Sequence, residues 1–380
     1  MKVMSLALSS VIFILSLFSN AYAVDVKLDN MNLKISGTAQ ILFTKSEIDC
    51  IDKQFDFHRM RFMVKGDINK NVKFFSEIEM SSNISPEQIE PPDAAWMATP
   101  NNRLNIPYKA SLTEKIAAGG RYAQKDVGTD SRLVQGYIDL KYHKKVTLRV
   151  GQMPRASSFE LNTPVSQLET IQYSTNVGQF GKFVRGFQIK TAPFKFLRVG
   201  IGIDDNNGGI TGSLDSSDSK LSPGIKIALL PWKKHIQIKL CGRRLSETTS
   251  GPDANCAIGG VNFKYSGFHF MGEIYSVHLN PLATTDKKGL NLKKGDITSW
   301  FLHASYMIPV INLQLVARYN YFEKRIKFKK TEQFALHYDM EVLTCGFNWN
   351  FAKNTRLQVM YDSVNGSYND SLDVLLQASF

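Results

Sequence analysis

The sequence predicts an all-β chain that forms a transmembrane antiparallel β-barrel of about 16 strands. Three observations predict this fold. Apolar and polar residues alternate with a period of two along most of the chain, which is the pattern of strands with two different faces. Short and long connections alternate between the expected strands. Beyond the first segment, no apolar run is long enough to form a transmembrane helix.

The composition excludes two classes of protein. The 380 residues include 46 Lys and Arg against 34 Asp and Glu, a formal net charge of +12, and 43% are hydrophobic. The mean hydropathy of −0.19 excludes a polytopic helical membrane protein, which needs repeated apolar runs of about 20 residues. The many aromatic residues and the mixed charges exclude a disordered chain. The length alone is typical of two or three soluble domains, but the strand pattern predicts one.

Residues 1–23 have the composition of a secretory signal peptide. Lys2 gives a basic start, residues 6–18 form a short apolar run, and Ala21, Tyr22 and Ala23 form a small-x-small cleavage site. Because this run is too short to cross a hydrocarbon core of about 30 Å, we do not expect a transmembrane anchor. We expect cleavage after Ala23, which leaves residues 24–380 as the barrel.

The alternation defines the expected strands. In one of them, Leu315 and Ala317 lie on the apolar face, whereas Gln314 and Arg318 lie on the polar face. The expected strands cover residues 31–43, 55–66, 72–80, 132–142, 145–152, 183–191, 195–204, 223–230, 235–243, 256–265, 267–278, 297–308, 311–322, 341–351, 355–363 and 371–380.

The connections indicate how the barrel is oriented. Short connections such as 143–144 and 352–354 alternate with long polar ones. The longest are 81–131, which we expect to be an extracellular loop, and 153–182. An even strand number with tight turns at one end is the layout of a bacterial outer-membrane barrel, with both termini in the periplasm. A secreted β-sandwich is the alternative, but it would not segregate long loops so regularly.

Aromatic residues on the apolar face fall at two levels. Trp349 and Phe351 lie near the short turns, and Trp300 and Tyr361 lie near the long loops. Two such bands are typical of the two membrane interfaces. The chain ends on Phe380, in phase with the apolar face of its last strand. A terminal aromatic in this position resembles the signal read by the bacterial barrel-assembly machinery, so we expect Phe380 to be an assembly signal.

The polar faces should line a lumen, because a barrel of about 16 strands leaves an aqueous channel. Basic residues on these faces outnumber acidic ones, and a low-dielectric tube with that bias concentrates anions. Guanidinium groups suit phosphate-like oxyanions because they donate two parallel hydrogen bonds. The alternative is that the cations pair with lumenal carboxylates or face lipopolysaccharide. The expected pore-lining, anion-binding residues are Arg59, Arg61, Lys73, Arg149, Arg155, Lys190, Lys239, Arg243, Arg318 and Arg356.

Several short stretches resemble the phosphate-selective porin O/P family. They are FHRMR at 57–61, VGQMP at 150–154, TCGFNW at 344–349, TRLQ at 355–358 and LQASF at 376–380. The resemblance spans most of the chain after the signal peptide, although each motif is short. It implies a homotrimeric, 16-stranded porin in which the 153–182 connection folds inward as a constriction loop.

The resemblance also implies an arginine ladder along the pore and a lysine-rich constriction. Arg59 and Arg61 match the ladder motif. The 153–182 connection departs from the pattern, because its acidic residues Glu160 and Glu169 match its basic residues in number. A general or weakly anion-selective pore is therefore equally consistent with the sequence.

The cysteines and histidines predict neither a metal site nor a cofactor. The four cysteines lack metal-ligand spacing, and the seven histidines are scattered along the chain. Cys241 and Cys256 lie near the long-loop ends of consecutive strands, so we hypothesise a disulfide between them in an oxidising compartment. Direct pairing of the strands would instead place Cys241 beside Ile258.

These patterns predict a bacterial outer-membrane porin, a passive channel for small hydrophilic solutes that prefers inorganic or organic anions. No phosphate-loop, nucleophile-elbow or zincin motif is present, so we expect no enzyme activity. We expect contacts with outer-membrane lipid and lipopolysaccharide, and, because the chain is secreted, none with nucleic acid. Two alternatives stay open: an adhesin that uses the 81–131 loop, and a barrel hydrolase with a Ser/His pair at its rim.

Overall fold

The structure is a computed structural model of the whole chain. It describes residues 24–28, 31–46, 54–83, 89–90, 121–122, 128–154, 158–171, 173–174, 183–204, 221–232, 235–245, 254–280, 292–328, 335–365 and 370–380. The expected signal peptide, most of the 81–131 loop and Arg155 lie outside these residues. Among the residues that the structure describes, no helix is long and apolar enough to cross a lipid bilayer.

The main sheet contains 17 strands, and 16 of them form a closed ring. The other strand, β1 (Val24–Leu28), pairs antiparallel with the start of β2. The strands of the ring are β2 (Met31–Ser46), β3 (Gln54–Asn69), β4 (Val72–Asn83), β7 (Gly128–His143), β8 (Val146–Pro154), β9 (Phe183–Phe194), β10 (Leu197–Asp204), β11 (Ser222–Trp232), β12 (Ile236–Leu245), β13 (Ala254–Tyr265), β14 (Phe268–Leu279), β15 (Leu292–Ile308), β16 (Leu313–Phe328), β17 (Ala335–Ala352), β18 (Thr355–Val364) and β19 (Ser371–Ser379).

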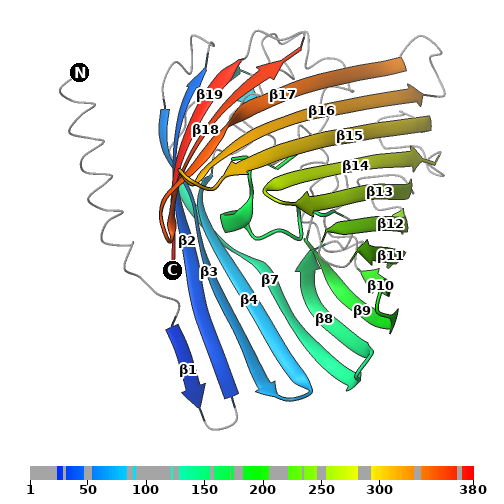
Figure 1. The fold of residues 1–380 in the computed structure, drawn as a ribbon. Helices are drawn as coiled ribbons and strands as arrows, with labels where there is room; N and C mark the ends of the chain where they lie inside the picture. The colour runs from blue at the N-terminus through cyan, green and yellow to red at the C-terminus, as the bar shows by residue number, and fades with distance from the viewer. Residues whose placement is uncertain are drawn as a thin grey trace.

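Each strand of the ring pairs antiparallel with the next, and β19 closes the ring on β2 (Figure 1). In the closing pair, Ser371 lies opposite Ser46 and Ser379 lies opposite Thr38. A closed ring leaves no unpaired sheet edge, which is the condition for a sheet to lie in lipid. The prediction of an antiparallel all-β barrel is therefore confirmed.

The strands run further than the alternation predicts at their long-loop ends. β15 begins at Leu292 rather than at residue 297, and β17 begins at Ala335 rather than at 341. The added residues are largely polar or charged on both faces, so they carry no period-two signal. Three short strands were not predicted: β1, and the pair β5 (Ile89–Glu90) and β6 (Arg121–Tyr122) within the 81–131 connection.

The wall of the barrel is apolar outside and polar inside, the reverse of a soluble protein. In β16, Leu315 is 48% exposed, whereas Gln314, Arg318 and Asn320 are 9%, 4% and 2% exposed. This is the face assignment that the alternation predicts. An apolar exterior of this kind suits lipid, because lipid cannot hydrogen-bond to polar groups.

Exposed aromatic side chains gather at the short-turn end of the wall. Trp232 packs against His235 and Tyr265, with ring centroids 4.7 and 6.0 Å away. Phe268 packs on Tyr306 with ring centroids 4.4 Å apart. Rings that are half exposed yet stacked on one another form the band that a membrane interface favours.

The last residue of the chain belongs to the barrel closure. Phe380 exchanges two backbone hydrogen bonds with Gly37: its amide donates at 2.9 Å and its carbonyl accepts at 2.8 Å. Its ring meets the ring of Phe62 edge to face, with centroids 6.0 Å apart. Phe380 therefore pins the end of β19 to β2 and β3. Its expected role in assembly stays a prediction.

Candidate functional site

A segment of the β8–β9 connection, residues 158–171 and 173–174, lies inside the ring of strands (Figure 1). We call it the inward segment. It follows β8 in the chain, yet its hydrogen-bond partners are mostly on β14 to β19, on another part of the wall. Ser158 is fully buried, and Phe159 and Ile171 are each 4% exposed. The inward segment therefore packs against the inner face of the barrel.

Two apolar contacts hold the inward segment. Phe159 packs with Met271 and Phe301, and Ile171 packs with a group of inward-facing residues. Those residues are Leu42, Val316, Met360 and Leu375. They lie on the mostly polar inner face where the inward segment covers it. Burial of such side chains contributes about 1.5–3 kcal/mol each, which favours a docked segment.

Gly260 makes room for one of these contacts. A Cβ at this position would lie 3.1 Å from the ring of Phe159 and 2.9 Å from the side chain of Glu273. Any larger residue would push the inward segment off the wall, so the glycine permits the close approach of Phe159 to β13.

A buried ion pair joins the inward segment to β16. Arg318 Nη1 donates to Glu160 Oε1 at 2.9 Å and to Thr170 Oγ1 at 2.8 Å. The second carboxylate oxygen of Glu160 accepts from the amide of Ser174 at 2.8 Å. Because both charged side chains are at most 4% exposed, the loss of either would leave the other as a buried, uncompensated charge.

A second carboxylate, Glu273 on β14, binds the start of the inward segment. It accepts from Ser158 Oγ at 2.9 Å, from Tyr275 Oη at 2.8 Å and from the backbone amide of Phe159. The carboxylate is 3% exposed. These three donors thus replace the hydrogen bonds from water that the carboxylate loses on burial.

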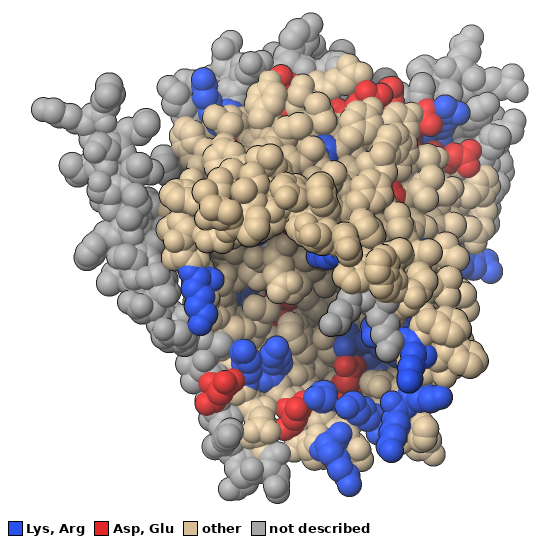
Figure 2. Space-filling view, viewed as in Figure 1, with Lys and Arg blue, Asp and Glu red and all other residues tan. Residues whose placement is uncertain are grey.

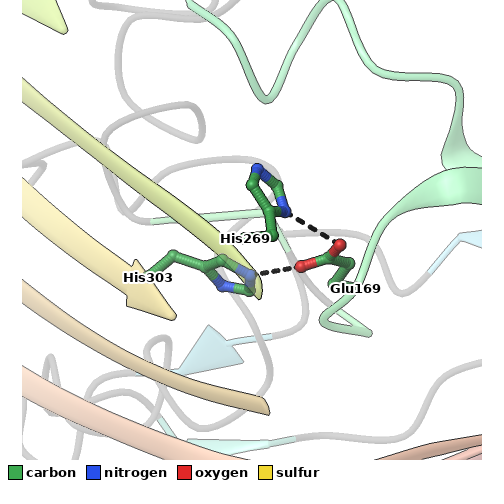
Figure 3. A group of neighbouring side chains, drawn as sticks. All are labelled: Glu169, His269 and His303. Carbon is green, nitrogen blue, oxygen red and sulfur yellow. Dashed lines mark hydrogen bonds and ion pairs between the residues drawn. The ribbon is translucent and has the colours of Figure 1, made fainter. Parts of the chain in front are cut away.

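A third carboxylate, Glu169, lies between two histidines of the wall (Figure 3). His269 Nδ1 is 2.8 Å from Oε1, and His303 Nε2 is 2.5 Å from Oε2. Burial alone would raise the pKa of Glu169, but the hydrogen bonds from His269 and His303 lower this pKa well below its ordinary value. Glu169 is therefore held as a carboxylate.

Side-chain amides of the wall complete the docking. Asn348 donates to the carbonyl of Glu169 at 2.9 Å, and Gln358 donates to the same carbonyl at 3.3 Å. Gln377 donates to the carbonyl of Ser166 at 3.1 Å. The inward segment has little regular structure of its own, so these amides satisfy backbone groups that would otherwise be buried without partners.

The structure pairs five of the expected anion-binding residues with carboxylates. Besides Arg318, Arg61 pairs with Glu77 at 2.9 Å and with Glu79, and Arg149 pairs with Asp139 at 2.6 Å. The remaining pairs are Lys73 with Asp67, at 2.6 Å, and Arg243 with Asp204. These cations are already matched by negative charge, so they add little net positive charge to the lumen.

Two further expected residues, Arg356 and Arg59, are buried in the inner wall. Arg356 donates to Gln358 and Gln377, each at 3.1 Å. Arg59 is 9% exposed and hydrogen-bonds to His58. Both belong to the hydrogen-bonded inner wall. Arg155 lies outside the described residues.

The last two expected residues, Lys190 and Lys239, lie in a cluster that we call the basic wall: Lys190, Arg198, Lys226 and Lys239. No carboxylate lies within 4.0 Å of these four cationic groups among the residues that the structure describes. The ammonium of Lys239 lies 3.8 Å from the centre of the Phe159 ring, where a cation–π contact replaces an ion pair.

The strand register brings the basic wall together. Gly200 lies opposite Lys190 on one side and Lys226 on the other, and Ala228 lies between Arg198 and Lys239 in the same way. Strands are about 4.8 Å apart, so the members of each pair are separated by roughly 10 Å. Lys226 was absent from the predicted set, although its alternation with Ile225 and Ile227 carries the signal that places it on the polar face.

The hypothesised disulfide is not formed in this structure, and it stays a prediction. Cys241 and Cys256 are both thiols in the structure. The direct register places Cys241 opposite Ile258 and Cys256 opposite Arg243, so the two cysteines are diagonal neighbours rather than a facing pair. Diagonal positions are about 7–8 Å apart, which exceeds the Cβ separation that a disulfide spans.

The distribution of charge is visible on the molecular surface (Figure 2). The face shown is hollowed near its middle, and Lys and Arg side chains gather below the hollow, toward the short connections. Asp and Glu side chains lie among them. The view agrees with the pairing described above, in which much of the positive charge has a negative neighbour.

Comparisons with known proteins agree on the fold. No protein-family model matches the chain, and no curated protein sequence matches it. Among solved structures, the outer-membrane channel DcaP of Acinetobacter baumannii has a TM-score of 0.64 at 12% identity, over 94% of this chain and 100% of that chain. Salmonella typhi OmpF, in complex with daunomycin, has a TM-score of 0.62 at 11% identity, with the same coverage.

A third neighbour is the anion-selective porin from Comamonas acidovorans. Its TM-score is 0.55 at 10% identity, over 92% of this chain and all of the porin chain. Identities this low establish the fold and nothing finer. The chain therefore has the closed 16-stranded barrel fold of the outer-membrane porins.

Proposed function

We propose that the chain is a bacterial outer-membrane porin, a passive water-filled channel for small hydrophilic solutes that prefers anions. One observation carries the proposal: the closed barrel is apolar outside and polar inside, and its inner face holds an unmatched group of cations. An apolar exterior suits lipid, and a polar interior of this size holds water. We propose a channel rather than an enzyme, because the sequence has no phosphate-loop, nucleophile-elbow or zincin motif.

The anion preference rests on the basic wall. Arg61, Arg149, Arg243 and Arg318 are each matched by a carboxylate, so their fields largely cancel at a distance. The basic wall has no such match in the described part of the chain. Unmatched charge in a low-dielectric tube concentrates counter-ions and repels co-ions. The anion-selective porin among the structural neighbours makes this function compatible with the fold.

We further propose that the inward segment narrows the lumen, as the resemblance to the phosphate-selective porin O/P family implies for the 153–182 connection. Its own charges, Glu160 and Glu169, face the wall and are paired there. The segment therefore sets the width of the passage, and the basic wall sets its charge. Phosphate specificity follows only if members of the basic wall bind one oxyanion together, and a general anion-preferring pore is the alternative.

The remaining parts of the proposal come from the sequence. They are cleavage after Ala23, periplasmic termini, a homotrimer, contact with lipopolysaccharide, and recognition of Phe380 by the barrel-assembly machinery. The separation of short and long connections supports the orientation.

Electrophysiology in planar bilayers tests the proposal. We expect stepwise ion conductance in potassium chloride and a zero-current potential that favours chloride over potassium. Adding phosphate separates the finer alternatives, because block at low phosphate indicates a dedicated oxyanion site and indifference indicates a general pore. A folded barrel that does not conduct would contradict the channel and favour the adhesin, and cation preference would contradict the anion claim alone.

A further inference from the structure

Three metal-ligating side chains from distant parts of the chain meet inside the barrel (Figure 3). Glu169 comes from the inward segment, His269 from β14 and His303 from β15. One ligand atom from each lies within 4.8 Å of the other two. The rings of His269 and His303 meet edge to face on the wall, with centroids 5.4 Å apart. The docked inward segment adds Glu169 to this pair.

The donor set is one that transition metals favour. Two imidazole nitrogens and a carboxylate are the protein ligands of many zinc sites with an open fourth position. The side chains of Glu169, His269 and His303 are 16%, 11% and 3% exposed, so the group is largely buried but Glu169 and His269 keep some contact with solvent.

The neighbouring side chains orient the ligands. Asn262 Oδ1 lies 3.1 Å from His269 Nε2 and accepts a hydrogen bond from it, while Nδ1 faces Glu169. Ser305 Oγ donates to Glu169 Oε2 at 2.8 Å. A hydrogen bond from the remote nitrogen of a ligating histidine to an amide oxygen, and one to the ligating carboxylate, are the outer contacts that metal sites use.

We propose that Glu169, His269 and His303 form a binding site for a divalent transition-metal ion, zinc in the first place, which fastens the inward segment to the wall. Metal bonds of about 2.0–2.2 Å place tetrahedral ligand atoms roughly 3.3–3.6 Å apart. The His269–Glu169 contact of 2.8 Å and the His303–Glu169 contact of 2.5 Å must therefore open by about 0.5–1 Å to admit the ion. The flexible Glu169 side chain supplies that movement.

The bound ion replaces the hydrogen bonds that now join the two histidines to Glu169. The nitrogens His269 Nδ1 and His303 Nε2 lose any proton they carry to solvent and donate their lone pairs to the metal. The ion adds two positive charges on the inner face, beside a segment proposed to narrow the lumen. Zinc thus strengthens the docking of the inward segment and adds to the positive charge of the lumen.

Metal analysis of the purified full-length chain tests the site. We expect one zinc per chain after dialysis against zinc chloride in a phosphate-free buffer. Glu169→Gln and His303→Gln should each lower zinc affinity more than Asn262→Ala, whose loss of an outer contact should cost about 10–100-fold. His278→Gln is the matched control, because His278 pairs with Asp296 at 2.7 Å on the same two strands but has no third ligand among the described residues.

A second measurement covers variants that fail to fold. Cobalt added to the wild-type chain should give the intense visible absorption of a four-coordinate ion, and zinc should abolish it. The proposal is overturned if only hydrated six-coordinate cobalt is seen, if no zinc is retained, or if folded His303→Gln retains zinc as well as His278→Gln does. Metal content is independent of conductance, so this result and the test of the channel can fail separately.

Discussion

Two parts of the inner wall carry positive charge in different ways. On β14 to β19, where the inward segment docks, Arg318 is buried against Glu160, and His269 and His303 close on Glu169. On β9 to β12, the cations of the basic wall have no carboxylate within 4.0 Å among the described residues. Both parts come from strands with the same alternation, but the inward segment covers the first part and meets the basic wall at Lys239.

The difference separates two uses of charge. A cation that faces a carboxylate of the inward segment contributes to docking, and its field is cancelled nearby. A cation without such a partner keeps its field for solutes in the lumen. Docking should therefore depend on the first group and selectivity on the second, and the following predictions test that division.

The largest effect is expected for Glu160→Gln. Removing one partner of the buried pair leaves Arg318 uncompensated, at a cost of about 3–5 kcal/mol, which should release the inward segment. Single-channel recordings should show a larger and noisier conductance with little change in ion preference. The control is the double variant Glu160→Leu with Arg318→Met, because replacing both charges with apolar groups is often neutral. If Glu160→Gln leaves conductance unchanged, the pair does not hold the segment.

A smaller, pH-dependent effect is expected from Glu169. The folded state lowers the pKa of this carboxyl below its ordinary value of 4.5, so its contribution to docking is present above that pH. The contribution is lost progressively as the pH falls below 4.5 toward the lowered pKa of the folded state. Conductance recorded with a chelator present should therefore become noisier in acid. Glu169→Gln should lack this dependence, and an identical pH profile in both chains would contradict the role of Glu169.

The smallest effect is expected for Lys73→Gln. Lys73 pairs with Asp67 at 2.6 Å, but the two side chains are 44% and 47% exposed. Ion pairs in such positions contribute at most about 1 kcal/mol. The unfolding midpoint in denaturant and the single-channel conductance should both stay close to those of the wild-type chain. A large loss in either would contradict the inference that exposed ion pairs contribute little to the stability and conductance of this barrel.

Much of the barrel could be predicted because alternation is a local signal. Gln314, Leu315 and Arg318 reveal their faces through their immediate neighbours, and the strand positions follow from repeating that pattern. The short strand β1 and the two-residue strands β5 and β6 escaped prediction, because so few residues cannot establish a period.

The docking of the inward segment could not be predicted in the same way. Alternation places Arg318 on the inner face, but its partner Glu160 is 158 residues away in the chain. The group of Glu169, His269 and His303 forms only because the irregular inward segment docks beside β14 and β15. No spacing of residues in the sequence predicts it. The register of adjacent strands is easier to predict, because direct pairing of β12 and β13 places Cys241 beside Ile258, as the structure confirms.

The most direct test of the account is the zero-current potential of the wild-type chain and of the triple variant Lys190→Gln, Lys226→Gln and Lys239→Gln, under one potassium chloride gradient. The matched control replaces the exposed turn lysines Lys70, Lys144 and Lys353 with Gln. We predict chloride preference in the wild type and the control, and a chloride-to-potassium permeability ratio lower by about tenfold in the triple variant. An unchanged potential in the folded triple variant would contradict the assignment of selectivity to the basic wall.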